Sequence, residues 1–228
     1  MATLRRTTAA LVGAMMFAPT ILGAQVSVNG QLSLLEKKGE TSYDLWMATI
    51  YLVPAPPAKV KVKKESVTIT MHDREFGPHV TVTTVGSSVR FENQDPFAHN
   101  AFSNSESGTF DFGLSDRGTT VKKRLKHSGV YPVFCNVHAR MSAFVVVVST
   151  PYYTLAGVDG AFTIPAVPPG TYSLHAWHPR GGETSQSVTV TDAGLPEVTV
   201  ELDARGFRAT AHKNKLGKAY ASDAGTKY

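Results

Sequence analysis

The chain has 228 residues, 42% of them hydrophobic and 18% charged, which is enough for one or two domains with a sizeable buried core. Its 23 lysines and arginines exceed its 18 aspartates and glutamates, but six basic side chains and only one acidic side chain lie within residues 205–228. Because the basic excess belongs to this polar tail, the composition argues against a nucleic-acid partner.

Residues 1–24 predict a secretory signal peptide. Arg5 and Arg6 provide a basic start, residues 9–18 are apolar, and ILGA precedes Gln25 as a plausible cleavage end. The apolar stretch is too short for a comfortable membrane span. We therefore expect an exported protein, periplasmic or secreted, with no stable membrane insertion after cleavage.

Most of the remaining chain alternates apolar and polar residues with a period of two, which predicts strands. In chain order the predicted strands are 26–35, 48–53, 67–72, 80–85, 89–93, 119–125, 129–135, 142–149, 160–164, 170–177, 186–191 and 197–202. The run SAFVVVVS is continuously apolar and predicts a strand that is buried on both faces. The fold class is therefore all-β, with two β-sandwiches, followed by a basic flexible tail.

The single cysteine of the chain is Cys135, at the end of a predicted strand. An exported protein with one cysteine cannot form an internal disulfide, so its thiol is buried, paired between chains or bound to a metal. His138 and Met141 follow at spacings of three residues, and His99 lies upstream in an expected loop after the strand VRFEN. A thiolate, two imidazoles and a weak axial thioether are the ligand set of a blue-copper electron-transfer site.

Other interpretations of these residues stay open. A lone cysteine or methionine beside an apolar strand is more often a core residue, and zinc also accepts one cysteine with two histidines. A binuclear purple-copper centre needs two bridging cysteines, and this chain has one, which argues against such a centre. We expect His175 and His178 to lie at the surface and Trp177 to lie in the core. No nucleophile elbow, phosphate loop or carboxylate pair predicts an enzyme.

The segment FENQDPFAHNAF…GVYPVFCNVHARMSAFVVVV resembles the cupredoxin family, and its short ligand loop is similar to that of amicyanin. The resemblance implies a Greek-key β-sandwich with one type 1 copper ion. It implies that the ligands are His99, Cys135, His138 and Met141, and that Asn100 ties the two ligand-bearing loops together beside the thiolate.

The same resemblance implies a docking surface for a redox partner, such as a cytochrome or a dehydrogenase. In the family the second histidine ligand shows its ring edge through an apolar patch. In this chain that ligand is His138, with Pro96, Phe97 and Ala139 as expected neighbours.

The segment YYTLAGVDGAFTIPAVPPGTYSLHAWHP resembles the carboxypeptidase-regulatory or transthyretin-like β-sandwich. That fold normally begins with two strands such as 26–35 and 48–53, so we expect the cupredoxin to be inserted into it. The predicted organisation is a signal peptide (1–24), the first sandwich strands (25–58), a cupredoxin domain (59–150), the remaining sandwich strands (151–204) and the tail (205–228).

The order of these segments is similar to that of exported bacterial proteins of the methylamine-utilisation or cupredoxin-like kind. The sequence therefore predicts a carrier of single electrons. A protein that holds or delivers copper with the same ligands is the first alternative. The second alternative is a non-redox β-sandwich binding module in which Cys135 is only a core residue.

Overall fold

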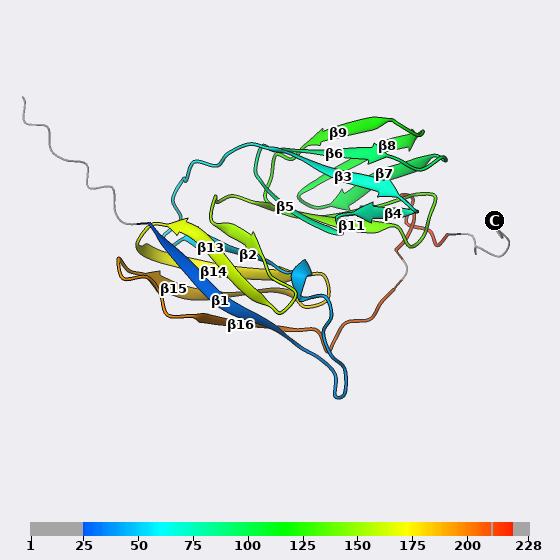
Figure 1. The fold of residues 1–228 in the computed structure, drawn as a ribbon. Helices are drawn as coiled ribbons and strands as arrows, with labels where there is room; N and C mark the ends of the chain where they lie inside the picture. The colour runs from blue at the N-terminus through cyan, green and yellow to red at the C-terminus, as the bar shows by residue number, and fades with distance from the viewer. Residues whose placement is uncertain (1–24, 211, 221–228) are drawn as a thin grey trace, which may run out of the picture.

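The computed structural model describes residues 25–210 and 212–220, and they form an all-β protein (Figure 1). The predicted signal peptide lies outside these residues. Within them no helix is long and apolar enough to cross a membrane. The strands are β1 Val26–Leu35, β2 Thr49–Pro54, β3 Ser66–His72, β4 Glu75–Gly77, β5 Val80–Thr84, β6 Ser88–Asn93, β7 His99–Ser105, β8 Gly108–Ser115, β9 Thr120–Arg124, β10 Gly129–Phe134, β11 Ser142–Val148, β12 Tyr153–Leu155, β13 Ala161–Val167, β14 Gly170–His178, β15 Gly182–Val190 and β16 Val198–Asp203, and one short 3-10 helix, η1, spans Leu45–Met47.

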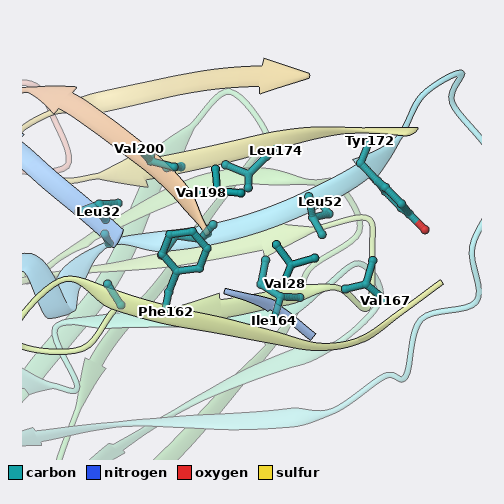
Figure 2. Packing of buried hydrophobic residues seen from close by; sticks show 14 of the residues in the cluster. Val28, Leu32, Leu52, Phe162, Ile164, Val167, Tyr172, Leu174, Val198 and Val200 are labelled. Carbon is teal, nitrogen blue, oxygen red and sulfur yellow. The ribbon is translucent and has the colours of Figure 1, made fainter. Parts of the chain in front are cut away.

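The first sandwich packs a sheet of order β13-β1-β16 against a sheet of order β12-β2-β14-β15. Alternate side chains of β1, β2, β13, β14 and β16 point inward and form one core, as Figure 2 shows. Gly30 is needed in β1, because a Cβ there would lie 2.3 Å from both the Phe162 ring and the Val198 carbonyl oxygen. Because Gly30 has no side chain, the Phe162 ring of β13 can pack directly against the backbone of β1.

The second sandwich packs a sheet of order β5-β11-β10-β7-β8 against a sheet of order β4-β3-β6-β9. Two of its pairings are parallel, β11 with β5 and β3 with β6, and the other pairings are antiparallel. Its core contains Ile69, Phe91 and Val145, together with Cys135 and Met141. The cysteine thus lies at the edge of a hydrophobic core.

Strand β11 is buried on both faces, as its continuous apolar run predicts. Val145 and Val147 enter the second core, whereas Val146 and Val148 pack in a separate cluster with Trp177 of β14. The Phe144 and Trp177 rings in that cluster have centroids 5.2 Å apart. The cluster therefore joins the two sandwiches, and Trp177 is a core residue as expected.

Strands β2 and β12 are antiparallel neighbours in one sheet. The chain consequently leaves the first sandwich after β2 and returns to it at an adjacent strand, with the whole second sandwich in between. A whole domain can be inserted between such neighbouring strands without disturbing the sheet, because its two ends lie close together.

The sequence missed strand β7. His99 is the first residue of this strand and not part of a loop, so that expectation was wrong. Six of the seven residues of β7 are buried, including the polar His99, Asn100, Ser103 and Ser105. A strand with polar residues on buried positions carries no alternation of apolar and polar residues, and the period-two pattern therefore could not reveal it.

Candidate metal centre

The loop between β10 and β11, residues 135–141, carries three of the four predicted ligands. The two strands form a hairpin in which Phe134 pairs with Ser142. Inside it the Cys135 N–H donates to the Met141 carbonyl at 3.1 Å, and the Met141 N–H donates to the His138 carbonyl at 3.1 Å. These two hydrogen bonds across the loop make it tight. A loop this tight can place Cys135, His138 and Met141, which are spaced three residues apart, on the same side.

His99 reaches the same place from the neighbouring strand, because β7 pairs with β10. The Cys135 Sγ lies 4.0 Å from His99 Nδ1 and 3.8 Å from His138 Nδ1. All three donor atoms lie within 4.8 Å of one another. Sulfur and nitrogen bound to one ion at about 2.3 Å and 2.0 Å, at a trigonal angle of about 120°, stand about 3.7 Å apart. The observed spacing therefore fits three donors around a single ion.

Burial differs among the predicted ligands. His99 and Cys135 are fully buried, Met141 is 1% exposed, and His138 is half-buried. Met141 belongs to the same core cluster as Cys135. The centre is therefore shielded from solvent except on the side of His138.

The surroundings of Cys135 favour the thiolate. Burial opposes ionisation, but the contact with His99 and the backbone N–H groups of Asn100, Val137 and His138 outweigh it and lower the pKa of the thiol. The Val137 N–H donates to Sγ at 3.4 Å. The thiolate is the form of cysteine that binds metals.

Asp95 orients the His99 ring, and the sequence analysis did not single it out. Its Oδ2 lies 2.6 Å from His99 Nε2, so this nitrogen carries the hydrogen and Nδ1 points toward Cys135. The carboxylate also accepts the N–H groups of Asp73 at 2.8 Å and Arg74 at 3.0 Å. Burial raises the pKa of Asp95, but these hydrogen bonds outweigh it and hold the pKa below its usual value. The sequence offered one indication of this contact, namely an acidic residue four positions before His99 in QDPFAHN.

Asn100 lies beside the thiolate, as the cupredoxin resemblance implies, but its side chain points elsewhere. Its Nδ2 donates to Asp111 Oδ1 at 2.8 Å and to the Gly113 carbonyl at 2.7 Å, which ties β7 to β8. Only its backbone N–H acts on Cys135. The link between the two ligand-bearing segments at this residue is therefore made by the backbone.

An aromatic side chain, that of Phe97, lies beside His138 near the surface. The Phe97 ring centroid lies 5.8 Å from that of His138 and 5.2 Å from that of His99. Phe97, Leu114 and Val137 are exposed. Of the other expected neighbours, Pro96 is exposed and Ala139 is half-buried.

The tail that follows β16 returns to the ligand loop, although it forms no strand over its described residues (Figure 1). We call residues 205–210 and 212–220 the strap. The Tyr220 hydroxyl donates to the Cys135 carbonyl at 2.5 Å, and the Lys215 N–H donates to Asn136 Oδ1 at 3.0 Å. The His212 ring stacks on Phe134 with centroids 4.5 Å apart. This part of the predicted flexible tail therefore has fixed partners around Cys135.

The prediction that His178 lies at the surface was wrong, because this residue is fully buried. The Arg180 N–H donates to its Nδ1 at 3.1 Å, so its Nε2 carries the hydrogen and donates to the Asp44 carbonyl at 3.0 Å. Both ring nitrogens are thus satisfied, and burial lowers the pKa of the imidazole. His175 is half-buried and bonds to Glu183 at 3.0 Å.

Comparison with known proteins gives partial matches. Residues 145–196 match the family model described as polysaccharide lyase family 4, domain II, and no curated protein matches the sequence. This model is not that of a carboxypeptidase-regulatory or transthyretin-like domain, so that assignment stays a prediction. The matched residues include β12 to β15 of the first sandwich.

Among solved structures, the chain is similar to a purple cupredoxin from Nitrosopumilus maritimus, with 20% identity over 36% of this chain and 99% of the other, at a TM-score of 0.33. A copper-containing nitrite reductase from Thermus scotoductus SA-01 matches with 26% identity over 42% of this chain and 27% of the other, at a TM-score of 0.35. A reduced Cu(I) form of an amicyanin variant matches with 18% identity over 45% of this chain and 99% of the other, at a TM-score of 0.35. Each match thus covers less than half of this chain.

Proposed function

We propose that this chain is an exported type 1 copper protein that carries single electrons between redox partners and is not itself an enzyme. The observation that carries the proposal is the convergence of His99, Cys135 and His138, whose donor atoms lie within 4.8 Å of one another. Met141, buried in the same cluster, is the proposed axial ligand. When bound, copper would supply a one-electron Cu(II)/Cu(I) couple.

The residues around these ligands support electron transfer over chemistry on a bound substrate. Asp95 fixes the His99 ring, and the hydrogen bonds across the loop fix Cys135 and Met141. A rigid donor set changes little between oxidation states, which suits electron transfer. Burial of all but His138 also limits access of small molecules to the centre.

We propose copper over zinc because the donor set includes soft sulfur. A thiolate with a thioether favours Cu(I), whereas zinc sites use cysteine, histidine and carboxylate. Zinc remains the competing occupant, since one cysteine and two histidines suit it as well.

The exposed surface around His138 is the proposed docking site for the redox partner. Phe97 and Val137 give this surface apolar side chains, and Phe97 contacts both histidine rings. Transient electron-transfer complexes use small interfaces, which an apolar patch beside a ligand at the surface could supply. We further propose that residues 59–150 form the inserted cupredoxin domain, for which the pairing of β2 with β12 is the support.

The test is the visible absorption and electron paramagnetic resonance of the copper-loaded mature chain. We expect an intense blue colour from thiolate-to-copper charge transfer, with narrow copper hyperfine splitting. Cys135→Ser should abolish both signals, and His138→Ala should weaken copper binding. His127→Ala, a change at an exposed histidine outside the centre, is the matched control and should leave the spectrum unchanged.

Four results would contradict the proposal. A colourless copper complex would indicate another coordination. A natively exported protein that contains zinc would indicate a zinc site, and one that contains no metal would indicate a binding module. Facile copper transfer to an apo acceptor, without reversible one-electron voltammetry, would favour copper delivery.

A further inference from the structure

A cavity of about 990 Å³ lies where the ligand loop, the first sandwich and the strap meet. The ligand loop contributes Ala139 and Arg140, the turn between β14 and β15 contributes Arg180, and the strap contributes Phe207 and Arg208. The volume is that of a site for a small organic molecule. The cavity does not contain any of the four proposed metal ligands among its lining residues.

The charges along this cavity are mainly positive. Three arginines line it against one carboxylate, that of Asp44. Arg180 binds both oxygens of Asp44 at 2.7 Å and 2.6 Å and also binds Glu36, so these two carboxylates already engage its charge. Among the described residues neither Arg140 nor Arg208 forms an ion pair.

Two guanidinium groups thus have donors to spare at one cavity. Arg208 uses one donor on the adjacent Phe207 carbonyl at 3.2 Å. Guanidinium groups stay charged at every physiological pH and bind carboxylates in a bidentate geometry. The charge balance therefore selects an anionic ligand.

Aromatic rings form part of the walls of the cavity. Phe134, Phe144 and Phe207 line it, and the His212 ring stacks on Phe134 within the same lining. Phenyl walls favour a flat apolar ligand, because they bury its faces and offer edge or stacked contacts. Aromatic walls beside free arginines fit a ring that carries a negative group.

We propose that this cavity binds a small aromatic carboxylate, with the ring among the phenylalanines and the carboxylate between Arg140 and Arg208. Phe134 directly precedes Cys135, and Ala139 directly follows His138. The bound molecule would therefore contact residues adjacent to two of the proposed metal ligands. If the proposed copper site is correct, binding of this molecule in the cavity would also shift the copper spectrum.

Benzoate is the probe, added to the full mature chain without metal and followed by calorimetry. We expect saturable 1:1 binding, at least tenfold weaker binding of acetate and of neutral benzamide, and at least a tenfold loss with Arg140→Gln or Arg208→Gln. Arg117→Gln, a change at an exposed arginine in the turn between β8 and β9, is the matched control and should bind as the natural chain does.

Absence of saturable benzoate binding would overturn the proposal, and so would equal binding of benzamide. Unchanged affinity in both arginine variants would place the ligand elsewhere and would overturn it too. If an arginine variant fails to fold, the comparison of benzoate with acetate and benzamide on the natural chain still decides. Because the measurement uses metal-free protein, its failure and the failure of the copper proposal are distinguishable.

Discussion

Replacing Tyr220 with phenylalanine removes one hydroxyl group from the strap and keeps the ring. That hydroxyl donates to the Cys135 carbonyl at 2.5 Å, and the ring contacts His212 with centroids 5.1 Å apart. The hydrogen bond contributes about 1 kcal/mol net to docking of the strap. We therefore expect Tyr220→Phe to increase the undocked fraction of the strap about fivefold.

The other strap contacts determine how much of the docking free energy remains in Tyr220→Phe. The Lys215–Asp111 ion pair, at 2.7 Å, is more than a third exposed on both sides and contributes about 0.5 kcal/mol. Stacking of His212 on Phe134 contributes about 1 kcal/mol. The lost hydroxyl is thus less than half of the docking energy, so the strap should loosen without detaching permanently.

The assay is the rate of Cu(I) transfer from the loaded protein to an excess of chelator, beside the rate of trypsin cleavage at the strap lysines. Both rates should rise about fivefold in Tyr220→Phe, because both require an undocked strap. Tyr43→Phe, a change at a tyrosine that is 84% exposed, is the matched control. Faster cleavage with an unchanged rate of copper transfer would refute the expectation that copper transfer requires an undocked strap. No change in either rate would refute the energy assigned to the hydrogen bond.

Two further predictions concern charged groups. Asp95→Asn removes the carboxylate that orients His99, and copper affinity measured by chelator competition should fall about 10- to 100-fold; an unchanged affinity would contradict that role. Hydrogen bonds from Arg180 lower the pKa of Glu36 and of Asp44 in the folded protein. The ion pairs therefore stabilise the fold fully above about pH 4–5, where both carboxyl groups are also ionised in the unfolded chain. This stabilisation is lost as the pH falls through the lower pKa values of the folded state. Arg180→Met should cost about 3 kcal/mol at pH 7 and should flatten this acid dependence in urea unfolding. Parallel curves for the two proteins would contradict the assignment of these pKa shifts to Arg180.

The hairpin that carries the ligand loop was predictable because its signals are local. Alternation and the continuous apolar run located β10 and β11 to within one residue at each end. The spacing of Cys135, His138 and Met141 required only that the loop between those strands be short. Local patterns of this kind depend on neighbours along the chain and not on the tertiary fold.

The remainder of the centre depends on contacts between distant segments. Tyr220 is 85 residues from Cys135, and the strap has no periodic pattern that would indicate where it docks. His178 was assigned to the surface because an isolated pair of histidines seldom completes a metal site. Its burial depends on backbone partners, one of them 134 residues away at Asp44.

The strap connects the first sandwich to the ligand loop of the second sandwich. Strand β16 of the first sandwich ends at Asp203, and the strap that begins two residues later contacts the second sandwich at Phe134, Cys135 and Asn136. Phe97 and Val137 keep exposed side chains with the strap in place. Chain from the first sandwich therefore covers one side of the ligand loop and leaves the apolar side open. The proposed redox partner would reach His138 from that open side, and the Tyr220→Phe variant tests whether release of copper depends on the covered side.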